Sequence, residues 1–115
     1  MAMRTGNTKV VHSVLALVIL LGVGAFPSRA EEPGEQVYKT KCAVCHGTDG
    51  KGETSVGKAD KVRDLGSADV QKQSDADLTG VITNGKNKMP AYGRSLKPEQ
   101  IKALVTYIRS LGRKP

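Results

Sequence analysis

The chain has 115 residues, of which 38% are hydrophobic but only 3% aromatic, and it carries a formal net charge of +7 at pH 7. A chain of this length holds one small domain. Its basic residues form no run interleaved with aromatic side chains, so the composition argues against a nucleic-acid-binding protein.

Residues 1–30 have the pattern of a secretory signal peptide, with two basic residues near the start, an apolar run over about residues 13–26 and small residues before a cleavage site after about Ala30. The alternative is an uncleaved anchor, but the apolar run is short for a bilayer core of about 30 Å. We therefore expect an exported, periplasmic protein without stable membrane insertion, whose domain spans residues 31–115.

Residues 31–115 carry few large side chains for a core of their own. Their aromatic residues are Tyr38, Tyr92 and Tyr107, and a domain of this size is marginal without a further source of burial. A large apolar cofactor at the centre would supply it. Three of the 18 basic residues precede residue 31, so this part has 15 Lys and Arg against 11 Asp and Glu, a net charge of +4.

The first predicted helix spans residues 34–45 and leads into a Cys-Ala-Val-Cys-His motif at residues 42–46. Cys-x-x-Cys-His is the c-type haem attachment sequence, in which two thiols form thioethers with the haem vinyl groups and the histidine binds iron. On a helical stretch Cys42 and Cys45 face one side, and His46 can lie under the ring they hold. His46 is the only histidine after residue 30, so one chain offers no second histidine ligand.

Three other interpretations of the cysteines fit less well. The first is a disulfide, which is what two cysteines in an exported protein ordinarily form. A dithiol redox site usually lies within a βαβ pattern, and the sequence shows none. A structural zinc ion needs four ligands, whereas residues 31–115 offer three candidates, the two cysteines and the histidine.

Residues 47–66 are polar and glycine-rich, with no periodic apolar face. A segment of this length without regular structure usually has a function, and we predict a loop that wraps the histidine side of the haem. After it, Ser67 is placed to cap a short helical turn over residues 68–71.

A second helix is predicted over residues 75–83. Ser74 is followed three residues later by an acid, the pattern of an N-terminal capping box, and Asn84-Gly85 provides a stop because both residues tolerate the left-handed conformation. The apolar stripe of this helix consists of Leu78, Val81 and Ile82.

The last predicted helix spans residues 98–111. Pro98 suits its first turn, and Gly112 follows its end. Its apolar residues recur at intervals of three and four, which indicates a core-facing stripe. These residues are Ile101, Leu104, Val105, Ile108 and Leu111.

Over residues 34–112 the sequence resembles a small class I c-type cytochrome. The matching residues are Gly34 and Tyr38 before the haem motif, Leu104 and Tyr107 in the last helix, and the Met89-Pro90 pair after a helix that ends in Asn-Gly. The resemblance implies an all-α fold of three to four short helices wrapped around one covalently attached haem c. It also implies that the first and last helices cross.

Met89 is the candidate for the second axial ligand of the haem iron, opposite His46. It is the only methionine after residue 30 and precedes Pro90 in a polar segment, although core packing is the commoner role of methionine. A thioether ligand raises the reduction potential. In many members of the family a loop proline orients the histidine, and this chain has none between Pro33 and Pro90. Asn87 and Tyr92 are expected either to hydrogen-bond on the methionine side or to be solvated.

The resemblance implies a monomeric electron carrier that exchanges one electron with redox proteins and is not an enzyme. Two alternatives are a haem enzyme or sensor in which Met89 dissociates, and an electron-donating subunit of a dehydrogenase or oxidase complex. Lysines near the haem edge either steer the carrier to acidic partners or are simply solvated. These lysines are Lys39, Lys41, Lys86 and Lys88.

Overall fold

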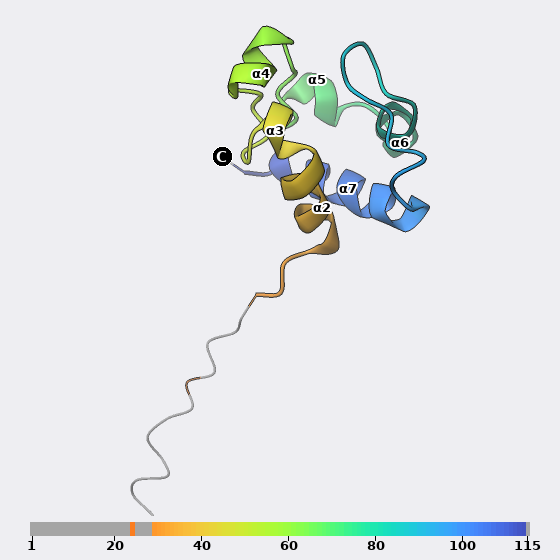
Figure 1. Ribbon diagram of the computed structural model, residues 1–115. Helices are drawn as coiled ribbons and strands as arrows, with labels where there is room; N and C mark the ends of the chain where they lie inside the picture. The colour runs from red at the N-terminus through yellow and green to blue at the C-terminus, as the bar shows by residue number, and fades with distance from the viewer. Residues whose placement is uncertain (1–23, 25–28, 115) are drawn as a thin grey trace, which may run out of the picture.

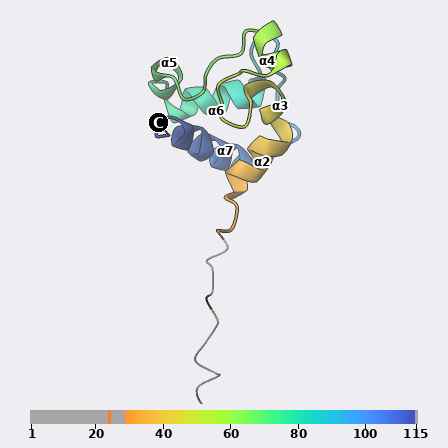
Figure 2. The same cartoon turned by 90° about the vertical axis from the view of Figure 1, so that its left-hand side faces the viewer.

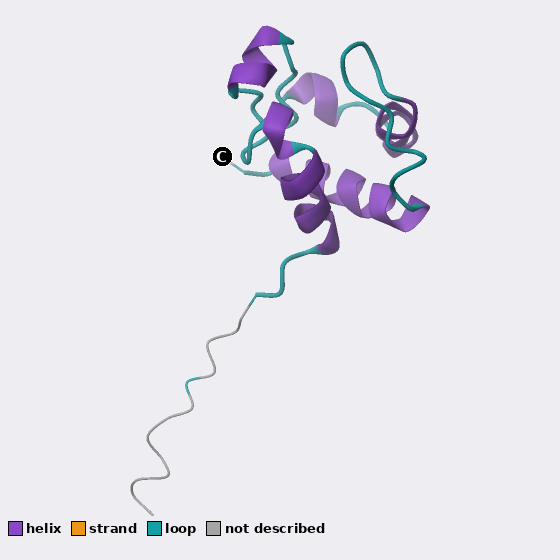
Figure 3. Cartoon of the chain, viewed as in Figure 1, coloured by secondary structure: helices purple, strands orange, loops and turns teal. Residues whose placement is uncertain are grey.

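The computed structural model describes Gly24 and residues 29–114 (Figure 1), so the predicted signal peptide lies almost entirely outside the described residues. All the regular elements of the described part are helices, labelled α2 to α7, and it contains no strand (Figure 3). This confirms the all-α prediction. Within the same residues, no helix combines the length and the apolar character needed to cross a membrane.

The predicted first helix is divided into two, α2 (Pro33–Lys41) and α3 (Ala43–His46). The division falls at Cys42, whose φ of −113° lies outside the helical range. Two backbone hydrogen bonds bridge it, from Cys42 N to Tyr38 O at 2.8 Å and from His46 N to Cys42 O at 3.0 Å. The haem motif therefore begins at a helix junction rather than in the middle of a continuous helix.

Helix α7 (Pro98–Leu111) crosses α2 and makes its main contact with it (Figures 1 and 2). A Cβ atom on Gly34 would lie 2.1 Å from the carbonyl oxygen of Ala103, so only glycine allows the two backbones to approach this closely. The ring of Tyr38 on α2 packs against the ring of Tyr107 on α7, with the two centroids 4.9 Å apart. The predicted crossing of the first and last helices is confirmed.

The segment 47–66 is not all loop, because it contains the short helix α4 (Ser55–Ala59). The Thr54 hydroxyl caps this helix by accepting from Gly57 N and donates to the carbonyl of Cys45 at 2.9 Å. Gly57 lies so close to α3 that a Cβ atom would be 2.4 Å from Cys45 O. Five residues are too few to show an apolar period, which is why the sequence pattern did not reveal α4.

Helices α5 (Ala68–Gln71) and α6 (Asp75–Asn84) match the predicted elements to within one residue. The Ser67 side chain caps α5, and Ser74 forms the predicted capping box with Asp77 at the start of α6. Helix α6 ends at Asn84, and the next residue, Gly85, has a positive φ of 74° as expected for a glycine stop.

The core is formed by α7 together with residues of α2, α5 and α6. All five residues of the predicted α7 stripe are buried, as are Tyr38, Val70, Leu78 and Ile82. Arg109 joins α7 to the α5–α6 junction, because its guanidinium donates to the carbonyl oxygens of Gln71 and Gln73 and to the Asp75 carboxylate. One side of α6 faces the end of α3 and the segment after α4 across a pocket.

Candidate cofactor pocket

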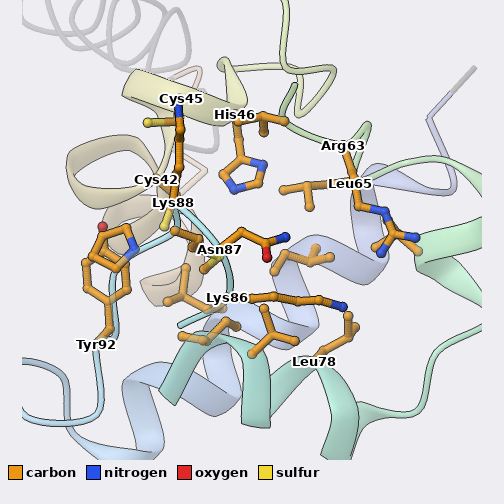
Figure 4. Close-up of a pocket in the computed structure, with 18 of the residues that line it drawn as sticks. Cys42, Cys45, His46, Arg63, Leu65, Leu78, Lys86, Asn87, Lys88 and Tyr92 are labelled. Carbon is orange, nitrogen blue, oxygen red and sulfur yellow. The ribbon is translucent and has the colours of Figure 1, made fainter. Parts of the chain in front are cut away.

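The described chain encloses a pocket of about 360 Å³ between α3, α6, α7 and the segments on either side (Figure 4). This volume is within the range of about 300–1,000 Å³ that small-molecule and cofactor sites occupy. Cys42, Cys45, His46 and Met89 all line it, although Met89 lies more than 40 residues from the other three in the chain. The inner wall is aliphatic and includes Val70, Leu78, Ile82, Leu104 and Ile108.

His46 points from the end of α3 into the pocket (Figure 4). The backbone that carries it is fixed on two sides, since the Tyr38 hydroxyl donates to Gly47 O at 2.6 Å and Gly52 N donates to His46 O at 2.8 Å. Burial lowers the pKa of the imidazole, and the backbone of Arg63 opposes this in part. The ring is therefore neutral at pH 7, which is the form that binds a metal.

The Nδ1 atom of His46 is buried and makes no hydrogen bond of normal geometry with the described residues. The backbone of Arg63 raises the pKa of the ring against the effect of burial, so its carbonyl is the candidate acceptor. The sequence offered no proline for this role, and Arg63 is the candidate in its place. A carbonyl at this position orients a metal-binding imidazole by accepting the proton of its second nitrogen.

Cys42 and Cys45 are both free and half-buried. Burial, with a smaller contribution from the charge of Cys45, raises the pKa of the Cys42 thiol to about 11. This thiol is therefore protonated at neutral pH. The two cysteines are not joined in a disulfide, and their half-buried positions leave both thiols beside the pocket that His46 enters.

Met89 reaches the pocket from a tight turn after α6. Lys86 and Met89 exchange two backbone hydrogen bonds, of 3.1 and 2.9 Å, around the two intervening residues. Asn87 has a φ of 53° in this turn, a conformation that asparagine adopts more readily than most residues. A Cβ atom on Gly85 would lie 2.6 Å from Met89 O, so the glycine stop of α6 also sets the approach of the methionine turn.

Two side-chain contacts join the methionine segment to the opposite side of the pocket. The Tyr92 hydroxyl donates to the carbonyl of Lys41 at 3.1 Å, beside Cys42. The Lys88 ammonium pairs with the Asp60 carboxylate at 2.9 Å. Tyr92 therefore makes a hydrogen bond, but to the end of α2 rather than on the methionine side as expected. The sequence carried no signal for Asp60, because one acid in a polar loop resembles any other.

The four lysines singled out in the sequence are not equivalent. Lys39 pairs with Glu31 and Glu35 and lies outside the pocket lining. Lys88 pairs with Asp60. Lys41 and Lys86 line the pocket and form no ion pair within the described residues. Lys61 and Arg63 also line it, so the polar margin is mainly positive.

The donor set fits a covalently attached haem. Two free thiols stand three residues apart, an imidazole and a thioether reach the same pocket, and the wall between them is aliphatic. Thiols can form thioethers with haem vinyl groups, while histidine and methionine are established axial ligands of haem iron. The basic margin suits the two carboxylates that a haem carries.

Comparison with known proteins gives one consistent result. Residues 29–108 match the family model described as cytochrome c oxidase, cbb3-type, subunit III. A cytochrome c6 of Gloeothece citriformis (strain PCC 7424) is 35% identical over 107 residues, covering 87% of this chain and 91% of that protein. The cbb3-type cytochrome c oxidase subunit FixP of Azorhizobium caulinodans is 34% identical over 94 residues, covering 81% of this chain.

The chain spans 31% of the length of that FixP subunit, so the match covers one part of that longer protein. Among solved structures, the KustC0563 c-type cytochrome is similar, with a TM-score of 0.64 and 34% identity, over 68% of this chain and 95% of that one. The similarity covers nearly the whole of that cytochrome, so the two chains share the helix arrangement described above.

Proposed function

The chain belongs to the class I c-type cytochromes, which carry covalently bound haem c and transfer electrons, and we propose that it is a single-haem electron carrier with His46 and Met89 as axial ligands. The observation that carries the proposal is that both residues reach one pocket together with the two cysteines. We further propose that the protein is exported with removal of residues 1–30, that residues 31–115 form the functional domain, and that it transforms no substrate.

Bound haem supplies the one-electron couple of its iron, and the residues of the chain control its surroundings. Cys42 and Cys45 would hold the group covalently, and His46 and Met89 would both bind its iron, which would leave no open site for a small molecule. The aliphatic wall keeps water away from the pocket floor. The main chain of Arg63 is the candidate partner that would orient the imidazole of His46.

Electron exchange requires the exposed margin of the pocket to meet a redox partner. Lys41 and Lys86 lie on this margin without a carboxylate partner in the described residues. We assign them the steering role, with an acidic surface on the partner protein, because such attraction raises association rates. Lys39 has no part in it, since it is paired with two acids away from the pocket.

An absorption spectrum of the full chain, produced with a c-type haem maturation system, tests the ligand assignment. We expect the weak far-red charge-transfer band of ferric iron bound to thioether sulfur, and its loss in Met89→Ala. Val56→Ala is a matched control, because Val56 is exposed and lies outside the pocket lining. Covalent haem without the band in the unmodified protein, or carbon monoxide binding to its reduced form at neutral pH, would instead support a haem enzyme or sensor.

A second candidate is the electron-donating subunit of an oxidase complex. The family model and the FixP relative favour it, because both are named for subunits of a cbb3-type oxidase. The chemistry at the haem would be the same, and only the partner would differ. Co-purification of the tagged protein with a membrane oxidase through gel filtration would support the subunit role, whereas elution as a monomer of about the chain's mass favours a free carrier.

A further inference from the structure

The Lys88–Asp60 ion pair spans the pocket from the methionine side to the histidine side. Lys88 is the residue before Met89, within the turn closed by the Lys86–Met89 hydrogen bonds. Asp60 follows α4, the helix that packs against α3 and so against His46. The two residues both line the pocket and are 28 positions apart in the chain. The pair thus joins the turn that carries Met89 to the end of α4, the helix that packs against the helix carrying His46.

Local structure does not explain the position of the Asp60 carboxylate. Asp60 stands at the C-terminal end of α4, where a helix favours positive rather than negative side chains. Its side chain is only 26% exposed, against 72% for Lys88. Lys88 is the cation with which this partly buried carboxylate forms its ion pair, at 2.9 Å between Nζ and Oδ1.

The backbone on both sides holds the pair in register. Asp60 N donates to Val56 O at 2.9 Å, and Val62 N donates to Gly57 O at 2.8 Å, so the end of α4 is tied down. On the other side, Lys88 sits between Asn87, with its left-handed φ of 53°, and Met89. Because the turn has only two central residues, a displacement of Lys88 is transmitted directly to Met89.

We propose that the Lys88–Asp60 pair is a strap across the pocket mouth that positions Met89 and keeps its sulfur on the iron. The inference rests on the ligand assignment proposed above and extends it to two residues that act through Met89 rather than on the iron. Without the strap, the turn keeps its attachment to the end of α6 and the Tyr92 contact with Lys41, but it loses its link to the histidine side. Another ligand then replaces Met89 on the iron more readily.

Imidazole binding to the ferric, haem-loaded protein measures how readily Met89 leaves the iron. We expect Lys88→Gln and Asp60→Asn each to raise the apparent affinity for imidazole by about two- to fivefold, the range for a single partly exposed ion pair. The double variant should show the same increase as either single one, because each change removes the same interaction. Added salt should raise the affinity of the unmodified protein toward that of the variants.

Lys39→Gln is the matched control, since it removes a paired lysine on α2 away from the pocket, and it should leave imidazole affinity unchanged. Unchanged affinity in both strap variants, or single effects that add in the double variant, would overturn the strap. The far-red band of the unmodified protein separates the two proposals. If that band is present, such results refute the strap alone, and if it is absent, the Met89 assignment fails and the strap with it.

Discussion

At the scale of single residues, Tyr38 links the core to the haem motif. Its side chain is completely buried, and its hydroxyl donates to the carbonyl of Gly47, the residue after His46. Burial, and to a lesser degree the neighbouring Cys42, raises the pKa of this hydroxyl far above 10. The phenol is therefore a neutral hydrogen-bond donor whose partner lies one residue from the proposed iron ligand.

Replacing Tyr38 with phenylalanine would leave the Gly47 carbonyl without its donor. We expect Tyr38→Phe to lower the free energy of unfolding by about 1–3 kcal/mol, measured by urea denaturation at pH 7. Tyr107→Phe is the control, because its ring packs against Tyr38 but its hydroxyl makes no hydrogen bond within the described residues. An equal loss in the control would show that the effect does not come from the hydrogen bond to Gly47.

The unmodified protein and Tyr38→Phe should also differ in how their stability depends on pH. Because the pKa of Tyr38 is raised on folding, its stabilising contribution is full below about pH 10, where the unfolded tyrosine is still protonated, and decreases as the pH rises further. The stability difference between the unmodified protein and Tyr38→Phe should therefore shrink as the pH rises above about 10. A constant difference over this range would contradict the assignment.

Sequence reasoning located the candidate ligands because their residue types are scarce in residues 31–115. One histidine, one methionine and two cysteines leave few combinations, and the structure brings all four to one pocket. Asp60 and Arg63 could not be found in this way. Their roles depend on the path of the 47–66 segment, and acids and arginines occur throughout the chain.

At the scale of helices, two glycines with opposite surroundings test the packing of α2 and α6. Gly34 faces the α7 backbone, where an added Cβ atom would lie only 2.1 Å from Ala103 O, whereas a Cβ atom on Gly80 would meet nothing within 4 Å. Gly34→Ala should lower the free energy of unfolding by about 1–3 kcal/mol or more, because α2 and α7 must separate. Thermal unfolding of the haem-loaded protein, followed by circular dichroism, measures the change.

Gly80→Ala is the matched substitution in the interior of α6. Here the added methyl group is free of contacts and reduces the entropy of the unfolded chain, so we expect a gain of about 0.5–1 kcal/mol. Equal effects of the two substitutions would show that helix propensity, and not the approach of α2 to α7, governs both positions.

The helices that sequence patterns predicted best are those with a long apolar stripe or a full set of caps. The bounds of α7 match the predicted range, and α6 extends one residue beyond it. The division at Cys42 and the short helix α4 were missed for a different reason. The change at Cys42 is confined to one residue and α4 has only five residues, so neither leaves an apolar period in the sequence.

At the scale of the whole molecule, the unpaired basic residues of the pocket margin should control how charged redox reagents approach. We expect the double variant Lys41→Glu and Lys86→Glu to slow oxidation by ferricyanide by about threefold or more at low ionic strength, and to accelerate oxidation by a cationic cobalt complex. Stopped-flow rates over a range of salt concentrations measure both. The opposite signs separate charge steering from a change in reduction potential.

Lys39→Glu serves as the comparison, because Lys39 lies outside the pocket lining. Its effect on both reagents should be smaller than that of the double variant. Slower reaction with ferricyanide in Lys39→Glu than in the double variant would place the site of electron exchange elsewhere on the surface.

The small size of the fully enclosed interior has a consequence for the life of the protein in the cell. Among the described residues, Tyr38 and Leu104 are the largest side chains that are fully buried, so we expect the bound haem to supply a large share of the hydrophobic stabilisation. Chains that have received their haem can stay folded, while unloaded chains open more often and are exposed to proteases. Haem attachment would thereby act as quality control, since we expect proteases to cleave the haem-free chain faster than the haem-loaded one.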